Sequence, residues 1–488
     1  MVSDDSVRGA MARGFATLST GRIAVLGLQF VTLGVLAAHL EPAGLGVFTF
    51  GLAAAGIFQL LPNFGLVAVL SRDVAQRPEL EPWLVPNVIY IRTLLGIVSY
   101  GLLAIGVFVV DVGDANTRAA LVAGLTILIV FDVFRSTLEV RLRLVWISLA
   151  DIVEATVTVG GTIALAQSGA GPESFLWLYV ALKVVNATIV GLAARRMVGY
   201  RWSLRRDLWR PVVEAAVPLG VASVFMALYY RLDILILAWL KEAEDVGQYG
   251  VAYRFLDAFS ILPAITMTVL SPVLSRSVVE GTHSLGPRYR EAAHLVSVAA
   301  VFVAVVGGAT AWRILPELPG FSRFEGGGIA LSILCPAAGL ILVGTVVQGT
   351  LISSHLQGRL LRISGTGLAV NLALNLALIP PFSYVGAAIA TTITEVVLIG
   401  LSLREIRREL ELGWDGRRLL SLALVALLTG AVLGAGFLLS PWLQLALGTV
   451  CFFVALPLLG VLGVGEVREL LRRNPVRASQ DPPPPEPG

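Results

Sequence analysis

The stretch "GVFTFGLAAAGIFQLLP" at residues 46–62 has a second copy, "GQYGVAYRFLDAFSILP", at residues 247–263. Both copies fit the pattern G-x-[FY]-x9-F-x-[LI]-L-P, and equivalent residues are separated by a constant 201 positions. Internal repeats of this kind are typical of transporter folds, in which two copies of one helical unit enclose a central site. The sequence therefore predicts a duplicated fold.

The chain around these copies has the composition of a protein that crosses a membrane many times. Of its 488 residues, 56% are hydrophobic and 14% are charged, and long apolar runs occur from one end to the other. A membrane-spanning helix needs about 20 mostly apolar residues. Fourteen candidate spans meet this description, at roughly residues 15–39, 45–70, 84–110, 117–137, 144–166, 173–194, 211–240, 246–275, 291–312, 327–353, 360–379, 384–403, 418–439 and 441–463.

The two copies of the motif fall in the second and the eighth span, so the repeating unit is six helices long. Because six is even, both units have the same orientation and form parallel repeats. We expect an all-α membrane protein of about 14 transmembrane helices, with two parallel six-helix repeats and two extra C-terminal helices. The expected segments are an N-terminus (1–14), an N-lobe (15–197), an inter-lobe linker (198–210), a C-lobe (211–404), a loop (405–417), the extra helix pair (418–463) and a Pro-rich tail (464–488).

The distribution of positive charge indicates the orientation of these helices. Short loops that stay in the cytoplasm are enriched in Lys and Arg. With the N-terminus inside, 27 of the 36 Lys and Arg residues fall in inside segments, four fall in outside loops and five fall within spans. We therefore expect a multi-pass protein of the cytoplasmic membrane with both termini in the cytoplasm.

Charged side chains within the expected spans are the candidate site residues. A charge at membrane depth costs roughly 2.5–3.5 kcal/mol on insertion scales, so such residues normally face a cavity and mark a pathway. The cations within spans are Arg22, Arg92, Lys183, Arg231 and Arg254. The deepest acids are Asp233, Asp257 and Glu395. A cavity with this excess of cations suits an anionic substrate, because Arg can bind a phosphate or diphosphate through two donors.

The second lobe concentrates these charges. Arg254 and Asp257 lie in the second copy of the motif, and Arg231 and Asp233 lie at a similar depth in the span before it. Because the two spans should be antiparallel neighbours, all four charges can meet. Two interpretations stay open: the four line the cavity, or Arg254–Asp257 and Arg231–Asp233 form closed pairs that hold the lobe together. For Arg22, near the membrane surface, contact with lipid head groups is a second interpretation.

Two tyrosines accompany the acids of the second lobe. Tyr229 precedes Asp233 by four residues, and Tyr253 precedes Asp257 by the same spacing. A phenol at this spacing can donate a hydrogen bond to the carboxylate or present its ring to a ligand. We expect Asp233, Asp257 and Glu395 to have one of two roles. They set the charge balance of the cavity, or they bind H⁺ or Na⁺, whose gradient would then drive transport.

Other charges lie nearer the cytoplasmic surface. Asp132, Arg135 and Glu139 follow one helical face close to the end of the fourth span, and Asp151 and Glu154 lie near the start of the fifth. A solvated helix end is the favoured interpretation of the first three residues. All five are therefore left out of the expected site.

Several classes of function are disfavoured by what the chain lacks. The charges sit in short clusters and form no basic face of the kind that binds nucleic acid. Cys335 and Cys451 lie in apolar runs, and the four His residues have neither metal-ligand spacing nor the context of a catalytic triad. We expect no nucleic-acid partner, no metal, no catalytic residue and no bound cofactor.

Four stretches resemble a known family. "LEPAGLGVFTFGLAAAGIFQLLPNFGLVAVLSRDVA" (40–75), "YYRLDILIL" with "VGQYGVAYRFLDAFSILPAITMTVLSPVLSR" (229–237 and 246–276) and "NLALNLALIPPFSYVGAAIATTITEVV" (371–397) resemble polysaccharide-biosynthesis flippases of the O-antigen type. These flippases belong to a superfamily with the multidrug and toxin extrusion (MATE) transporters and the lipid II flippases. The resemblance covers about residues 15–404 and implies a MATE-like fold.

The resemblance also implies a function. Such a carrier moves a polyprenyl-diphosphate-linked oligosaccharide from the inner to the outer leaflet, by rocking two lobes around a cationic cavity. It implies a lipid-linked glycan and membrane lipids as partners, and contacts with polysaccharide-assembly proteins. Asp233 occupies the family's acidic position after the Tyr-rich stretch. Fourteen spans match the lipid II branch, where the extra helix pair forms a groove for the lipid tail.

Alternative functions are weighed against this one. A multidrug exporter of the same fold carries mainly organic cations, which an excess of cavity Arg would repel. A membrane glycosyltransferase or polymerase would need a sizeable outer loop, and no loop here exceeds about 16 residues by this segmentation. A non-transporting scaffold that recruits partners through the Pro-rich tail would leave the five buried cations unexplained.

Overall fold

The computed structural model describes residues 4–259, 261–280 and 282–461, and within these residues the fold is built of helices and turns, without a strand. The expected all-α fold is therefore confirmed, while the predicted Pro-rich tail at 464–488 lies outside the described residues. The chain divides into two compact units. Unit 1 comprises Met1–Phe259, Trp312–Leu334 and Gln357–Leu398, and unit 2 comprises Ser260–Ala311, Cys335–Leu356 and Ile399–Gly488. The lobe and linker boundaries stay a prediction.

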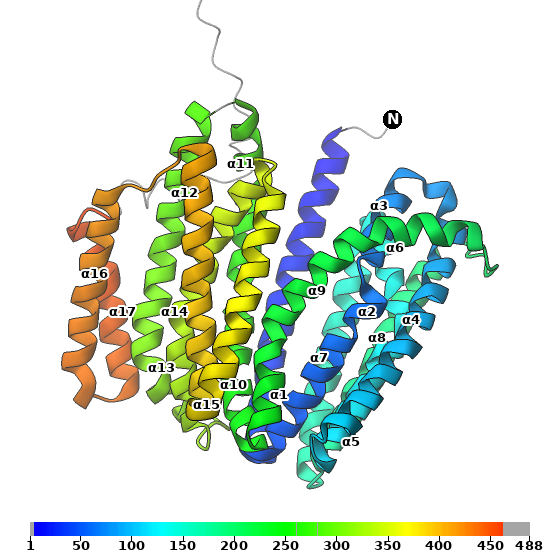
Figure 1. Cartoon of the computed structure of the whole chain (residues 1–488), viewed down its shortest axis with the longest axis horizontal. Helices are drawn as coiled ribbons and strands as arrows, with labels where there is room; N and C mark the ends of the chain where they lie inside the picture. The colour runs from blue at the N-terminus through cyan, green and yellow to red at the C-terminus, as the bar shows by residue number, and fades with distance from the viewer. Residues whose placement is uncertain (1–3, 260, 281, 462–488) are drawn as a thin grey trace, which may run out of the picture. The chain divides into compact units, whose positions relative to one another are not determined.

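Unit 1 contains the helices from α1 to α10, drawn from blue to green in Figure 1. They are α1 (Asp4–Phe58), α2 (Leu60–Asn63), α3 (Leu66–Gln76), α4 (Glu81–Val110), α5 (Asp114–Gly124), α6 (Phe134–Val140), α7 (Leu144–Gln167), α8 (Pro172–Arg195), α9 (Trp209–Leu240) and α10 (Ala243–Phe259). Two short 3₁₀ segments, Leu125–Leu128 and Val130–Val133, join α5 to α6. The first part of α14 (Glu325–Ser353) and most of α15 (Gln357–Leu410) complete the unit.

Unit 2 contains α11 (Ile261–Glu280), α12 (Thr282–Phe302), the first part of α13 (Gly308–Ile314), α16 (Gly416–Ala435) and α17 (Pro441–Leu458), with the remainders of α14 and α15. The helices α16 and α17 correspond to the expected extra pair. They start at capping residues, because the Asp415 side chain accepts from the backbone N–H of Arg417 and Ser440 accepts from that of Leu443. A cluster of Val298, Leu422, Val425, Phe452, Ala455, Leu456 and Val461 packs the pair against α12.

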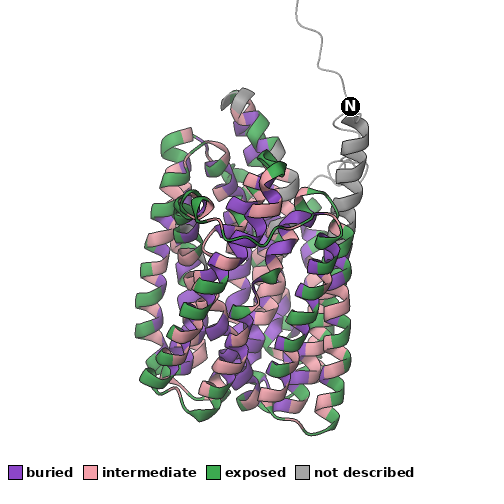
Figure 2. Cartoon of the chain, turned by 90° about the vertical axis from the view of Figure 1, so that its right-hand side faces the viewer, coloured by how far each residue is buried: buried purple, intermediate pink, exposed green. Residues whose placement is uncertain are grey.

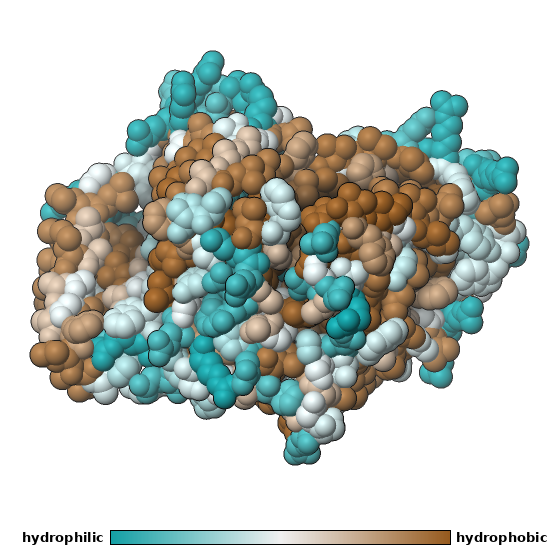
Figure 3. All heavy atoms as spheres, turned by 60° about the horizontal axis from the view of Figure 1, so that its bottom comes forward, coloured by the Kyte–Doolittle hydropathy of each residue, from teal (hydrophilic) through white to brown (hydrophobic). Residues whose placement is uncertain are grey.

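The protein is a multi-pass membrane protein. Eleven helices or helical segments among the described residues are long and apolar enough to cross a membrane. Large apolar side chains are exposed along one side of α4, where water would disfavour them and lipid would not; they are Leu94, Ile97, Val98, Leu102 and Ile105. Buried residues lie between the helices in Figure 2, and apolar residues cover their sides in Figure 3. The count of fourteen spans stays a prediction.

Two of the eleven segments are more than twice as long as one crossing requires. Gly21–Asn63 has 43 residues and Gln357–Leu410 has 54, whereas a helix crosses the hydrocarbon core with about 20. Each is interrupted by one non-helical residue, at Glu41 (φ 58°, ψ 174°) and at Ser383 (φ 51°, ψ −133°). Both interruptions fall between two expected spans, and prolines lie beside them, at Pro42 and at Pro380 and Pro381. The sequence breaks the helix where proline removes a backbone donor.

The two copies of the repeated motif meet inside unit 1. A Cβ atom added to Gly46 would lie 1.7 Å from the carbonyl oxygen of Ala243, and one added to Gly247 would lie 1.8 Å from that of Pro42. Pro42 and Ala243 are themselves 201 positions apart, as are the two glycines, so the contact is reciprocal. Only glycine allows two helix backbones to approach this closely. The motif thus encodes a crossing of α1 and α10, while the six-helix extent of the repeat stays a prediction.

We predict that Gly46→Ala and Gly247→Ala each destabilise the protein. The added methyl group would overlap a backbone carbonyl, and forcing extra atoms into a packed contact typically costs about 1–3 kcal/mol. The thermal unfolding midpoint of the purified protein in detergent measures the effect. The control is Gly27→Ala on α1, because a Cβ there would meet nothing within 4 Å. Equal midpoints for all three variants and the wild type would contradict the crossing.

Candidate functional site

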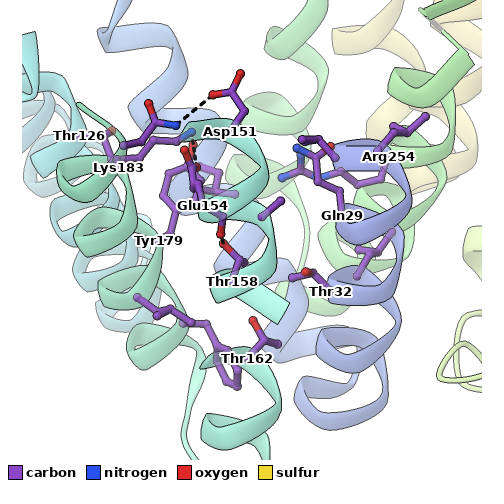
Figure 4. Close-up of a pocket in the computed structure, with 18 of the residues that line it drawn as sticks. Gln29, Thr32, Thr126, Asp151, Glu154, Thr158, Thr162, Tyr179, Lys183 and Arg254 are labelled. Atoms are coloured by element: carbon purple, nitrogen blue, oxygen red, sulfur yellow. Dashed lines mark hydrogen bonds and ion pairs between the residues drawn. The ribbon is translucent and has the colours of Figure 1, made fainter. Parts of the chain in front are cut away.

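Unit 1 encloses a cavity of about 720 Å³ that is the candidate site. Its walls come from α1, α6, α7, α8 and α10, with residues of the short segments between α5 and α6. In Figure 4, the side chains of α7 and α8 lie on one side of the cavity, and Gln29 of α1 and Arg254 of α10 lie on the other. The charged residues of the lining are Asp132, Arg135, Asp151, Glu154, Lys183, Arg254 and Asp257.

One group of charges joins α6, α7 and α8. The guanidinium of Arg135 pairs with both carboxylate oxygens of Asp151 and donates to the amide oxygen of Asn186 at 3.0 Å. Asn186 in turn donates to Asp151 at 3.0 Å. Each polar group therefore binds the two others, which satisfies hydrogen-bonding groups that a membrane interior would leave unpaired.

A second pair lies on α7 and α8. Lys183 Nζ is 2.7 Å from Glu154 Oε1 and 5.3 Å from the centre of the Tyr179 ring. The hydroxyl of Thr158, one turn after Glu154, donates to the Glu154 carbonyl at 2.7 Å. The Lys183 charge is thus neutralised within the wall of the cavity.

A third pair connects the cavity to a buried arginine. Asp132 lies on the lining, and its carboxylate accepts from Arg92 Nη1 at 2.8 Å. Arg92 also donates to the side-chain oxygen of Asn63 and is 1% exposed, whereas Asp132 is 41% exposed. Arg92 therefore acts on the cavity only through Asp132. Because Arg92 is not part of the cavity lining, its assignment as a substrate-binding residue stays a prediction that the cavity does not support.

The charges of α9 and α10 form one pair. Arg231 Nη2 is 3.8 Å from Asp257 Oδ2, and the Arg231 guanidinium lies 5.9 Å from the centre of the Tyr253 ring. Asp257 and Arg254 line the cavity, but Arg231 does not. Arg254 forms no hydrogen bond or ion pair with the described residues, although the nearby Asp257 acts on its charge. The expected antiparallel contact is present, but only Arg231 and Asp257 of the four charges pair.

Two acids are buried away from the cavity lining and bound by tyrosines. Asp233 accepts from the Tyr249 hydroxyl at 2.5 Å and from the backbone N–H of Ile234 at 2.8 Å. Glu395 on α15 accepts from the Tyr229 hydroxyl at 2.5 Å. The side chains of Asp233 and Glu395 are 2% and 5% exposed. Both acids therefore have neutral partners instead of cations.

Of the two interpretations of the Tyr-to-acid spacing, a hydrogen bond within one helix is not what the structure shows. Tyr229 donates to Glu395 instead of Asp233, and Tyr253 donates to the Tyr230 carbonyl at 2.6 Å instead of Asp257. Helical spacing places two residues on one face, but the acceptor that a hydroxyl reaches depends on the neighbouring helix. For the charges of the two suggested closed pairs, the ion pair that the structure describes joins Arg231 to Asp257.

The expected excess of cations is also absent from the lining. Among the described lining residues, three cations face four acids. Arg22 is exposed on α1 and lies outside the lining, as do Arg92 and Arg231. Depth along a helix was the basis of the prediction, and depth does not tell which way a side chain points.

Sequence reasoning missed Asp132, Arg135, Asp151, Glu154 and Asn186, which all line the cavity. Asp132 and Arg135 line the cavity, whereas the favoured interpretation placed them at a solvated helix end outside the site. A signal was present, because Asp151, Glu154 and the threonines that follow repeat every three or four residues along an otherwise apolar helix. A polar stripe of that kind in a membrane span indicates a face turned away from lipid.

Comparisons with known proteins identify a family and two relatives. The sequence matches the model of the family described as polysaccharide biosynthesis protein over residues 11–278. The probable flippase AglR of Haloferax volcanii is 26% identical over 261 residues, which cover 51% of this chain and 52% of that protein. The match thus spans about half the length of this relative. The probable low-salt glycan biosynthesis flippase Agl15 of Haloferax volcanii is 24% identical over 410 residues, 79% of this chain and 81% of that protein.

Solved structures share the fold. The lipid II flippase MurJ in an inward closed conformation has a TM-score of 0.72 at 13% identity, covering 94% of this chain and all of that one. An inward-facing multidrug resistance MATE family transporter has a TM-score of 0.61 at 15% identity, covering 80% of this chain and 99% of that one. The expected MATE-like fold is confirmed.

We predict that Arg92→Leu destabilises the protein strongly. Removing one partner of a buried ion pair leaves the other uncompensated, which typically costs about 3–5 kcal/mol. The thermal midpoint in detergent should fall, and the double variant Arg92→Leu with Asp132→Asn should recover part of the loss. An unchanged midpoint for Arg92→Leu would show that the pair contributes nothing to stability.

Proposed function

The chain belongs to the polysaccharide biosynthesis protein family, and on that basis we propose that it is an alternating-access flippase for a polyprenyl-diphosphate-linked oligosaccharide. It moves this lipid from the inner to the outer leaflet of the cytoplasmic membrane for cell-surface polysaccharide synthesis. The family match covers residues 11–278, and the two curated relatives carry the word flippase in their names. A transporter of this kind has no catalytic residues.

The charge pattern of the cavity carries the proposal. Each acid of the described lining has a cationic partner: Asp132 has Arg92, Asp151 has Arg135, Glu154 has Lys183 and Asp257 has Arg231. Arg254 is left as the cation without such a partner among the described lining residues. A guanidinium that faces a cavity in a membrane protein favours an anionic ligand and can hold phosphate oxygens through two donors.

The diphosphate is therefore placed at Arg254, on the α10 side of the cavity. Arg231 lies off the lining, and its Nη2 atom is 3.8 Å from Oδ2 of the lining residue Asp257. At this distance the ion pair can separate, and Arg231 can then bind a second anion. Lys183, on the other side of the cavity, is paired with Glu154 and is not assigned to the diphosphate. Of the expected substrate-binding residues, Arg254 and Lys183 face the cavity directly.

A multidrug exporter is the second candidate, because the fold is shared with MATE transporters. A cationic drug would need an acid that is free to bind it. In the described lining every acid is already paired with Arg or Lys, and the unpaired charge is positive. The cavity thus disfavours organic cations.

Orientation and partners follow from the same proposal. Both termini lie in the cytoplasm, since 27 Lys and Arg residues fall on that side and four on the other. The lipid-linked glycan then enters from the cytoplasmic leaflet, where it is made, and leaves on the outer side. Proteins that assemble the polysaccharide are the expected partners there.

Ion coupling is proposed for the two acids bound by tyrosines. Asp233 and Glu395 are buried, and their described side-chain partners are the hydroxyls of Tyr249 and Tyr229. A carboxylate with neutral partners in a membrane can take up H⁺ or Na⁺, whereas one with an arginine partner has its charge already balanced. Asp257 is of the second kind, because Arg231 is its partner.

We predict that Arg254→Ala lowers translocation of the lipid about ten- to hundredfold, since hydrogen bonds to a charged group contribute about 1.5–3 kcal/mol. The measurement uses liposomes that contain the purified protein and a fluorescent polyprenyl-diphosphate-linked sugar. Arg196→Ala, an exposed arginine outside the cavity lining, is the matched control.

Three outcomes separate the hypotheses. If Arg254→Ala folds and translocates like the wild type, the placement of the diphosphate fails. If the wild type moves no lipid but exports cationic dyes, the proposed function itself fails. Loss in Arg254→Ala with normal rates in Arg196→Ala supports both the function and the site.

We predict that Asp233→Asn and Glu395→Gln make translocation insensitive to an imposed gradient, because an amide keeps an oxygen for the tyrosine hydroxyl but cannot take up a proton and has no negative charge to balance Na⁺. Proton and Na⁺ gradients are applied to the liposomes one at a time. Glu214→Gln, at an exposed acid of α9, is the control. Gradient-driven transport that persists in both variants would locate coupling elsewhere, and a wild type that responds to neither gradient would exclude coupling by these ions.

A further inference from the structure

The α7 wall of the cavity carries a continuous polar stripe. Asp151, Glu154, Thr158 and Thr162 all line the cavity and recur every three or four residues, so they lie on one face of the helix. At a rise of about 1.5 Å per residue the stripe is about 16 Å long. That length exceeds a single sugar ring and suits an oligosaccharide.

The neighbouring helix α8 contributes a matching stripe. Tyr179, Lys183 and Asn186 line the cavity. Lys183 and Asn186 bind Glu154 and Asp151 of α7, and the Tyr179 ring lies beside Lys183. Figure 4 shows Lys183, Glu154, Tyr179, Thr158 and Thr162 together on this side, which we call the α7–α8 wall. The wall consists of Asp151, Glu154, Thr158, Thr162, Tyr179, Lys183 and Asn186.

The opposite side of the cavity is mainly apolar. The lining residues of the first part of α1 are Val25, Leu26, Gln29, Phe30, Thr32, Leu33 and Leu36. A pyranose ring has hydroxyl groups around its edge and C–H groups on its faces. A cavity with one polar and one apolar wall can satisfy both, since the hydroxyls find partners and the C–H groups are removed from water.

We propose that the α7–α8 wall binds the glycan of the transported lipid and selects uncharged sugars. The inference rests on the proposed function and deepens it, because Arg254 on the other side holds the diphosphate. The two parts of one head group are thus bound by two separate groups of side chains.

The preference for uncharged sugars follows from the pairing within the wall. Arg135 and Lys183 are both neutralised, by Asp151 and Glu154. An anionic sugar such as a uronic acid would bring a carboxylate that has no unpaired cation to bind on this side, and burying it would be costly. A hydroxyl or acetamido group can instead donate to the hydroxyl oxygen of Thr158, whose own proton is held by the Glu154 carbonyl.

The experiment compares three probes on the purified protein in detergent, with binding followed by the concentration dependence of the thermal shift. They are farnesyl diphosphate, farnesyl-diphosphate-linked N-acetylglucosamine and farnesyl-diphosphate-linked glucuronic acid. We expect the N-acetylglucosamine probe to bind more tightly than farnesyl diphosphate. We expect the glucuronic acid probe to bind no more tightly than farnesyl diphosphate.

The isosteric variant Thr158→Val tests the wall. It removes one hydroxyl acceptor and leaves every ion pair in place, so we expect about two- to tenfold weaker binding of the N-acetylglucosamine probe and unchanged binding of farnesyl diphosphate. Thr188→Val is the matched control, because Thr188 lies on α8, donates to the Val184 carbonyl in the same way and is exposed outside the cavity.

An exchange of charges separates recognition from structure. The double variant Glu154→Lys with Lys183→Glu can reform the ion pair with its charges reversed. A pair that only holds α7 to α8 would restore both stability and binding in this variant. Recognition of the sugar predicts restored stability with binding of the N-acetylglucosamine probe still weakened.

The outcomes distinguish the inference from the function on which it rests. If farnesyl diphosphate binds, Arg254→Ala abolishes its binding, and the added sugar gains nothing, the inference fails while the diphosphate site stands. Tighter binding of the glucuronic acid probe than of the N-acetylglucosamine probe overturns the selection of uncharged sugars. If no probe binds to the wild type, the proposed function fails and the inference fails with it.

Discussion

The close approach of Gly46 and Gly247 is the contact on which the site depends. Each glycine lies against a backbone carbonyl of the other helix, and the absence of two Cβ atoms is what lets α1 and α10 cross there. The same two helices carry the apolar wall of the cavity and Arg254. A wider crossing would separate the cation from the rest of the lining, so the geometry of the site follows from a packing contact made elsewhere along the same helices.

Pairing of charge is the second constraint. A membrane interior offers no water to stabilise a lone ion, so each acid of the described lining is held by an arginine or a lysine. Pairing also changes what a ligand encounters, because a paired charge presents a local dipole and an unpaired one presents a net charge. One unpaired guanidinium opposite a neutral polar wall suits a ligand with an anionic part and an uncharged polar part. A lipid-linked glycan has both.

The acids at membrane depth differ in their partners and in their position relative to the cavity. Asp257 has a cationic partner and lies on the cavity, whereas Asp233 and Glu395 have tyrosine partners and lie off it. Acids that are close in the sequence, such as Asp233 and Asp257, thus have different surroundings. In the proposed function, Asp257 balances charge near the substrate, and Asp233 takes up an ion without contacting the substrate.

The sequence by itself determined the helical membrane fold and the boundaries between spans near Pro42 and Pro380, and it showed the repeated motif. The first two follow from local physics: apolar length defines a span and proline interrupts a helix. That the glycines of the motif meet at a helix crossing came from the structure. The sequence also placed Arg254, Lys183 and Asp257 at the depth where the cavity lies. The tertiary structure alone decided that Arg22, Arg92 and Arg231 lie off the lining, that Tyr229 binds Glu395, and that Arg135, Asp151 and Asn186 form one group. Which way a side chain points, and which partner from a distant helix it meets, depends on how helices pack, and no local pattern contains that information.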